Sequence, residues 1–335
     1  MVWYDRKRVD AKGERNMELA MLGMIFLAGI ILIVKGGDWF VDAASWIAEV
    51  SGIPKLIVGA TIVSLATTLP ELLVSAMAAA QGKVDMAVGN AVGSVTANLG
   101  LIMAFSIICM PVKIRRGDYL LKSILMLAAS GLLIWGGHRG EVDLSLSLPL
   151  MAVFGVFTYE NLRGARRAMR CGGDLGPVRE APRKRAVFFQ CLKFSCGAAA
   201  VVLGADLLVD SAGALARLAG VSERVIGVTI VAVGTSLPEL VTTVTAIVKK
   251  QSALSVGNIL GANILDLTMI LPLSALLSGR ALPVSPVSAR IDLPACLIVG
   301  IIAVVPAMAA ARFRRWQGAA LLAVYGGYMV LTCGG

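Results

Sequence analysis

The chain has 335 residues, of which 57% are hydrophobic and 16% are charged, and its formal net charge is +10. A soluble domain carries about 45–50% apolar and roughly 25% charged residues, so this composition excludes a soluble globular domain, a disordered chain and a coiled coil. The basic residues cluster between long apolar stretches, which is typical of membrane-protein loops and argues against nucleic acid as the partner.

Ten apolar stretches are each long enough to cross a bilayer, which takes about 20 residues of α-helix. In chain order they are 19–35, 55–81, 85–111, 119–137, 144–162, 187–208, 224–248, 252–278, 292–311 and 315–333. Residues 1–16 precede the first stretch as an N-terminal extension, and we expect the natural chain to start at Met17. The sequence therefore predicts an all-α membrane protein with ten transmembrane helices.

The basic segment 163–186 separates two halves, 17–162 and 187–335, that are copies of each other. Residues 36–98 align with 204–266 without gaps, at a constant offset of 168 residues. The best-matching blocks pair GATIVSLATTLPELL (59–73) with GVTIVAVGTSLPELV (227–241), and VGNAVGSVTAN (88–98) with VGNILGANILD (256–266). Because each half holds an odd number of predicted spans, the second copy must enter the membrane inverted. Inverted repeats are typical of secondary transporters, whose site lies at the repeat interface. We expect two inverted five-helix repeats.

The loops also predict the orientation, because cytoplasmic loops of membrane proteins carry an excess of lysine and arginine. The loops on the side of the basic linker include Lys113, Lys249 and Arg312, whereas those on the other side hold few basic residues. We expect a multi-pass protein of the cell membrane with the linker 163–186 in the cytoplasm and both termini outside. The linker should lie against anionic membrane lipid.

Three carboxylates lie deep inside apolar segments. Glu71 and Glu239 occupy matching positions after a Leu-Pro pair, and Asp266 lies in the run NILDLTMIL. A charge at the centre of a membrane helix costs about 2.5–3.5 kcal/mol on insertion scales. Almost no basic residue lies at the same depth, so a bound cation or a proton must neutralise these groups.

Hydroxyl groups lie on the same helical face as the two glutamates. Thr67 and Thr68 precede Glu71 by four and three residues, and these spacings place side chains together on a helix. Thr235 and Ser236 precede Glu239 in the same way. The prolines Pro70 and Pro238 remove a helical donor and are expected to free backbone carbonyls of the preceding turn.

The second block adds an amide and a carboxylate. Ser94 and Asn98 are four residues apart, and their counterparts in the second half are Ala262 and Asp266. Together the two blocks offer carboxylate, hydroxyl, amide and carbonyl oxygens. Such an all-oxygen set favours hard cations such as Ca²⁺ and Na⁺ over zinc, copper or iron.

These two blocks resemble the α-repeats of the cation/Ca²⁺ exchanger superfamily, most closely the prokaryotic sodium/calcium exchangers. The resemblance covers both repeats and implies an antiporter that exchanges Ca²⁺ for Na⁺ by alternating access, without a cofactor. It implies the following ligand set: Glu71 and Glu239 shared by both ions, Thr67 and Thr235 for Ca²⁺, Thr68 and Ser236 for Na⁺, backbone carbonyls of Ser64 and Ala232, Asn98 and Asp266 in the middle of the site, and Ser94 at an outer position. The chain departs from the family at Ala262, where a serine is usual, so one outer hydroxyl ligand is missing.

Several other functions remain open from the residues alone. In a Ca²⁺/H⁺ antiporter, Glu71 and Glu239 would take protons in place of Na⁺, although the many hydroxyl groups favour Na⁺. Asn98 opposite Asp266 favours the Na⁺/Ca²⁺ branch over the K⁺-dependent one. A cation channel could also use carboxylates, but the chain shows no filter repeated by subunit symmetry. An intramembrane hydrolase is disfavoured because the single histidine, His138, accompanies no nucleophile motif, so we expect a non-enzyme.

Overall fold

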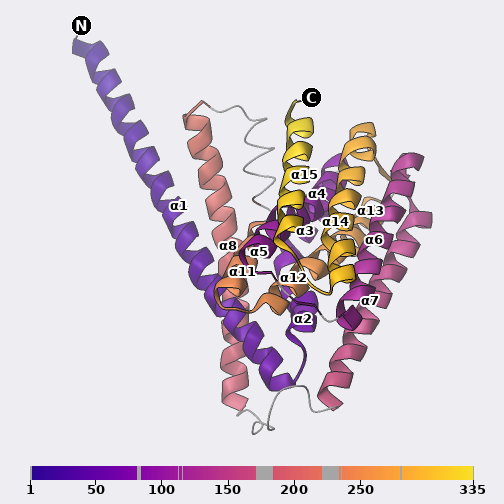
Figure 1. Ribbon diagram of the computed structural model, residues 1–335. Coiled ribbons are helices and arrows are strands. Elements are labelled where there is room, and N and C mark those ends of the chain that lie inside the picture. Colours follow the sequence, from indigo (N-terminus) through magenta and orange to yellow (C-terminus); the bar gives the residue numbers. More distant parts are fainter. Residues whose placement is uncertain are drawn as a thin grey trace.

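The computed structural model describes residues 2–80, 84–111, 113–114, 116–170, 184–220, 234, 236–279 and 281–334 (Figure 1). Its helices are α1 (Val2–Ser51), α2 (Lys55–Val58), α3 (Ser64–Ala80), α4 (Val84–Ala97), α5 (Ala104–Cys109), α6 (Arg116–Arg139), α7 (Leu144–Arg170), α8 (Lys184–Leu218), α11 (Leu237–Val248), α12 (Ser252–Leu265), α13 (Leu271–Ser278), α14 (Leu293–Ala310) and α15 (Arg315–Gly334). Four π-helical segments lie within these runs: η1 (Gly59–Val63), η2 (Asn98–Met103), η4 (Asp266–Ile270) and η5 (Ser288–Asp292). Two short strands, β1 (Glu141–Val142) and β2 (Leu282–Pro283), pair in antiparallel fashion. The fold is that of an all-α membrane protein.

Within the described residues, seven helical runs are long and apolar enough to cross a membrane. They are Met17–Ser51, Lys55–Leu73, Ala87–Cys109, Tyr119–Arg139, Lys184–Leu218, Ser252–Leu277 and Ser288–Ala310. The three other predicted spans correspond to α7, to the shorter apolar helix α11 and to α15, so the count of ten remains a prediction. Part of the predicted span 224–248 lies outside the described residues.

Two helices are much longer than the sequence predicted. The span expected at 19–35 is a single helix from Val2 to Ser51, and the one expected at 187–208 continues to Leu218. The predicted spans stop just before Asp38 and Asp210, where the apolar runs are interrupted by carboxylates. The two helices pass through these residues without a break because they pack against each other along their length.

The crossing of α1 and α8 depends on glycine. A Cβ atom at Gly36 would lie 2.9 Å from the carbonyl oxygen of Gly197, and one at Gly204 would lie 2.9 Å from that of Gly29. Residue numbers rise along α1 as they fall along α8, so the helices are antiparallel. Small residues let membrane helices approach this closely.

The outer surface is apolar, as lipid contact requires. On α1, Met24, Leu27, Ile31 and Val34 are all more than half exposed and follow one another at helical spacing. Exposed apolar side chains are unfavourable in water, so on a membrane protein they face the acyl chains of the lipid.

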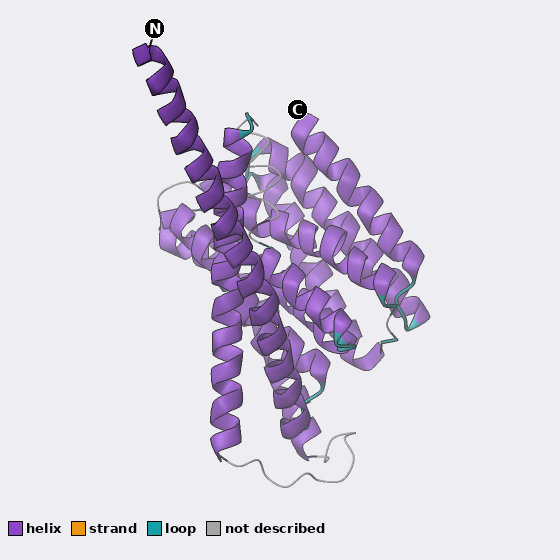
Figure 2. Ribbon diagram, turned by 90° about the vertical axis from the view of Figure 1, so that its left-hand side faces the viewer, coloured by secondary structure: helices purple, strands orange, loops and turns teal. Residues whose placement is uncertain are grey.

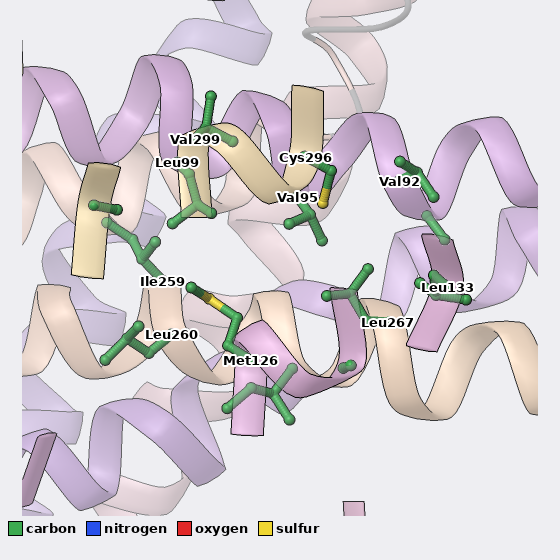
Figure 3. Packing of buried hydrophobic residues seen from close by; sticks show 14 of the residues in the cluster. Val92, Val95, Leu99, Met126, Leu133, Ile259, Leu260, Leu267, Cys296 and Val299 are labelled. Carbon is green, nitrogen blue, oxygen red and sulfur yellow. The ribbon is translucent and has the colours of Figure 1, made fainter. Parts of the chain in front are cut away.

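The buried core joins the two halves of the chain. Val92 and Val95 of α4, Met126 of α6, and Ile259 and Leu260 of α12 belong to one buried cluster (Figure 3). Figure 3 also shows Leu99, Leu133, Leu267, Cys296 and Val299 in the same cluster. The partly buried Leu72 of α3 and Leu240 of α11 pack against it.

Both termini lie at one end of the bundle. Figures 1 and 2 place the start of α1 and the end of α15 there, whereas α7 ends and α8 begins at the opposite end. We call this opposite end the linker end. Helix α7 runs on to Arg170 and α8 starts at Lys184, so helix occupies both ends of the predicted linker 163–186. Residues 171–183 lie outside the described part of the chain.

Candidate functional site

Three elements bring the deep carboxylates together. Glu71 lies in α3, Glu239 in the first turn of α11, and Asp266 at the start of η4. Each of the three is about 1% exposed. Glu71 interacts electrostatically with both Glu239 and Asp266. Three buried carboxylates from distant parts of the sequence thus interact with one another, and their role as ion ligands stays a prediction.

Two π-helical segments begin at matching site residues. Segment η2 starts at Asn98 and η4 starts at Asp266, which are counterparts at the repeat offset of 168 residues. A π turn inserts one residue into an α-helix and is frequent at functional sites. In this chain it places the amide and the carboxylate where the regular hydrogen-bond ladder of α4 and α12 is interrupted.

Most of the predicted ligand side chains have polar atoms that bond to nothing in the protein. The buried oxygens without a hydrogen-bond partner include Glu71 Oε1 and Oε2, Glu239 Oε2, Asp266 Oδ1, Asn98 Oδ1, Ser94 Oγ and Ser236 Oγ. Burying a charged or polar group without a partner is costly, and native proteins pair nearly all such groups. The seven unpaired oxygens on the predicted ligands are therefore suited to a cation that binds from outside the chain.

The threonine hydroxyls lie beside the glutamate of the other half. Thr68 Oγ1 approaches Glu239 Oε1 at 3.5 Å, and Thr67 also interacts with that carboxylate. Thr67 Oγ1 lies 3.3 Å from the carbonyl oxygen of Ser64, which is fully buried. The predicted site residues Thr235 and Ala232 lie outside the described residues.

Two asparagines brace the site, and the sequence reading missed both. Asn258 Oδ1 accepts a hydrogen bond from Thr67 at 3.2 Å, and its amide donates to Thr242 at 3.0 Å. This side chain of α12 thus ties α3 to α11. Asn90, its counterpart in the first half, donates to the backbone oxygen of Glu71 at 3.3 Å. The repetition of Gly-Asn at 89–90 and 257–258 is the signal that could have found them.

Close helix packing positions α12 against the start of α3. A Cβ atom at Gly261 would lie 2.5 Å from the hydroxyl oxygen of Ser64 and 2.7 Å from the carbonyl oxygen of Ala60. No larger residue fits at Gly261 without moving one of the helices. This contact holds α12, which leads directly into η4 and Asp266, close to the start of α3.

The site is not a cluster of acids alone. Among the described residues, no group of three His, Cys, Asp or Glu side chains is arranged to hold a metal ion by itself. Hydroxyl and carbonyl oxygens lie next to the buried carboxylates, and a mixed oxygen set of this kind suits Ca²⁺.

An ionic cluster joins α1 to α8 and to the C-terminal end of α11. Lys249, just after α11, lies 2.7 Å from Asp42 and 3.2 Å from Asp38, and Lys193 of α8 lies 3.1 Å from Asp42. Partial burial alone would lower the pKa of Lys249, but its bonds to Asp42 and Asp38 outweigh that effect and raise it. The lysine therefore stays charged at neutral pH, and the cluster persists.

Comparisons with known proteins agree with this arrangement. The family model described as sodium/calcium exchanger protein matches residues 21–162 and 190–334. The sodium/calcium exchanger MaX1 of Methanosarcina acetivorans is 30% identical over 92% of this chain and 97% of its own length. The inner membrane protein YrbG of Escherichia coli is 33% identical over 83% of this chain and 86% of its own.

A solved structure has the same fold. The sodium-calcium exchanger NCX_Mj, soaked with Na⁺ and without Ca²⁺, superposes with a TM-score of 0.76 at 28% identity. The match covers 94% of this chain and 99% of the other. The two halves matched by the family model, the shared fold and the buried oxygen cluster lead to one conclusion: the chain belongs to the sodium/calcium exchanger family.

Proposed function

We propose that this protein is an antiporter that exchanges Ca²⁺ for Na⁺ by alternating access at the cluster of Glu71, Glu239 and Asp266. The observation that carries the proposal is the set of buried, unpartnered oxygens on the predicted ligand residues. Family membership and the likeness to an exchanger structure support the same transport reaction. The protein is a transporter and not an enzyme.

The proposed ligands divide by chemistry. Glu71 and Glu239 serve both ions, because their four carboxylate oxygens supply the charge that either ion needs. Thr67 and Thr235 add oxygens for Ca²⁺, whereas Thr68 and Ser236 line the Na⁺ positions. The remaining proposed ligands are Asn98 and Asp266, the hydroxyl of Ser94 and the backbone carbonyls of Ser64 and Ala232. Since Ca²⁺ and Na⁺ share oxygens, one displaces the other.

Exchange follows from the cost of leaving the site empty. Three mutually repelling carboxylates without a cation are expensive to keep inside the membrane. The empty protein therefore switches the side to which its site is open slowly, whereas the ion-loaded protein switches it quickly. That difference couples the outward movement of one ion to the inward movement of the other.

Inverted repeats are the architecture we propose for the transporter. Its halves are 17–162 and 187–335, joined by the basic segment 163–186 and preceded by the extension 1–16. The crosswise glycine contacts between α1 and α8 support this arrangement, because Gly29 and Gly36 match Gly197 and Gly204 at the repeat offset. The matching starts of η2 and η4 support it as well.

The proposed setting is the cell membrane, with ten spans, a cytoplasmic linker end and both termini outside. Single cysteines introduced at Glu160 and at Arg290, in a background without native cysteines, can be labelled in intact cells by a membrane-impermeant maleimide. Labelling at Arg290 but not at Glu160 supports the orientation, and the reverse pattern would invert it.

Ion flux into proteoliposomes tests the transport reaction. Vesicles are loaded with Na⁺, the voltage is clamped, the pH is equal on both sides, and ⁴⁵Ca²⁺ uptake is followed. We expect uptake that requires the outward Na⁺ gradient and is absent in Glu71→Gln and Glu239→Gln. Glu160→Gln is the matched control, because Glu160 lies on α7 outside the carboxylate cluster.

Three outcomes would replace this function by another. Uptake driven by a pH gradient without Na⁺ would make the protein a Ca²⁺/H⁺ antiporter. Uptake that stops when choline replaces K⁺ would place it with the K⁺-dependent exchangers. Uptake with no counter-ion at all would make it a channel.

A further inference from the structure

A basic hollow lies at the linker end, between two loops. One loop connects α5 to α6 and the other connects α14 to α15. The Ile114 amide donates to the carbonyl oxygen of Ala311 at 3.0 Å, and Lys113 forms an isolated antiparallel bridge with Arg312. A hollow of about 280 Å³ opens between the loops; its lining residues are Pro111, Lys113, Arg312, Phe313, Arg314 and Arg315.

Four of these lining residues carry a positive charge. Within the described part of the chain, no ion pair joins Lys113, Arg312, Arg314 or Arg315 to a carboxylate. Two long helices also begin here, α6 at Arg116 and α15 at Arg315, and the start of a helix carries partial positive charge. The hollow therefore concentrates positive potential that the protein itself does not neutralise.

A buried aromatic ring and hydrogen bonds to the backbone form the walls of the hollow, together with its exposed side chains. Phe313 is 1% exposed, and its ring meets that of Tyr119 edge to face, with centroids 5.6 Å apart. The guanidinium of Arg116 donates to the carbonyl oxygen of Ala309 at 2.6 Å. These contacts anchor both loops, so the hollow exists before anything binds.

The hollow also lies at the depth of lipid headgroups. Trp316, next to Arg315, is 52% exposed, and exposed tryptophan gathers at the membrane–water interface. Exposed Phe105 of α5 and Val305 of α14 precede the two loops by six or seven residues. The two side chains therefore lie about 10 Å from the loops along their helices. Acyl chains of the lipid begin at that distance from the headgroups.

We propose that the basic hollow binds the phosphate headgroup of an anionic membrane phospholipid. The phosphate accepts hydrogen bonds from Arg312, Arg314 and Lys113, and the acyl chains follow the apolar surface of α5 and α14. Basic pockets between transmembrane helices are a known setting for such headgroups. This inference stands apart from the transport function, since it needs no ion at the carboxylate cluster.

The arginines of α7 provide a contrast. Arg163, Arg166, Arg167 and Arg170 line a hollow of about 290 Å³ at the same end of the molecule, but its described lining comes from that one helix. It has no second described wall and no buried ring at its base. The two surfaces therefore offer similar charge with different geometry, which makes α7 the matched control.

Native mass spectrometry of the full chain tests the proposal. The protein is taken from phosphatidylcholine nanodiscs that contain a minor fraction of phosphatidylglycerol, and retained lipids are counted. The hollow variant is Arg312→Gln/Arg314→Gln/Arg315→Gln, and the control variant is Arg166→Gln/Arg167→Gln/Arg170→Gln. We expect the hollow variant to lose at least about 25-fold in preference for phosphatidylglycerol, because Arg312 and Arg314 each lose a hydrogen bond to the phosphate that contributes about a fivefold factor. The control should change much less.

Other outcomes overturn the proposal. Equal losses in both variants would mean a diffuse surface effect, and no loss in either would mean that the hollow holds no lipid. Displacement of phosphatidylglycerol by millimolar inorganic phosphate would make it a site for free anions. If the triple variant unfolds in neutral detergent, the single variant Lys113→Gln replaces it in the test. Lys113 is exposed, and its substitution should lower the preference for phosphatidylglycerol about fivefold.

Discussion

Ion binding should stabilise the folded protein, and Glu71→Gln should abolish this effect. Both oxygens of Glu71 are buried and without a partner, so a bound cation is their first favourable contact. At an ion concentration of 100 times Kd, ligand binding adds about 2.7 kcal/mol to the free energy of unfolding. With the unfolding entropy typical of a soluble chain of this length, that corresponds to a rise of about 4 °C in Tm.

The substitution keeps the shape of the side chain and removes its charge. Loss of one partner from a buried ionic contact costs about 3–5 kcal/mol, which weakens binding by at least about 100-fold. At the same Ca²⁺ concentration the variant should gain less than about 1 °C. Without ions it should be at least as stable as the wild type, because one of three repelling carboxylates is gone.

The assay is thermal unfolding of purified protein in neutral detergent, with Ca²⁺, with Na⁺ or with choline. Glu160→Gln controls for the loss of a carboxylate outside the cluster and should keep the full shift. An equal Ca²⁺ shift in Glu71→Gln and wild type would show that the carboxylate cluster is not the binding site. A variant less stable than wild type in choline would show that Glu71 has a structural partner.

Three further substitutions test the surroundings of the site. Asn258→Ala should lower the free energy of unfolding by about 1–3 kcal/mol and weaken Ca²⁺ binding, since it leaves buried hydroxyls unpaired; calorimetry that finds unchanged affinity would contradict its bracing role. Gly204→Leu should stop Ca²⁺ flux while Ca²⁺ binding persists, because the new side chain meets the Gly29 backbone and separates α1 from α8; flux at the wild-type rate would refute this. Lys249→Gln should lower the free energy of unfolding by at most about 1 kcal/mol, because partly exposed ion pairs contribute no more than that, whereas Lys249→Arg should keep the wild-type value. Equal destabilisation of the two variants in thermal unfolding would show that the charge at residue 249 does not stabilise the cluster.

Sequence periodicity predicted the helices of this fold well, and its errors have physical causes. The helical run 252–278 has the expected bounds because apolar residues fill it and turns flank it. The ends of α1 and α8 were missed because Asp38 and Asp210 interrupt the apolar runs just beyond the predicted ends. Only the packing of one long helix on the other shows that both continue.

The site was predictable to the extent that the repeats encode it. Glu71, Glu239 and Asp266 were found because a carboxylate in an apolar run is costly and rare. Asn258 was missed because its role comes from a hydrogen bond across the two halves, to Thr67 at 3.2 Å. No pattern within one half of the sequence reveals a partner that lies in the other.

The segments η2 and η4 give the chain an unusual tolerance to change in length. Deleting one residue from an ordinary membrane helix turns everything after it by about 100° and buries the wrong face. A π turn already contains one residue more than an α-helical turn, so removing Leu99 would restore a regular helix and leave α5 in place. Such a deletion should spare folding and destroy the geometry around Asn98. The proposed ion ligands Asn98 and Asp266 thus lie at the two positions where one inserted residue is absorbed by the helix.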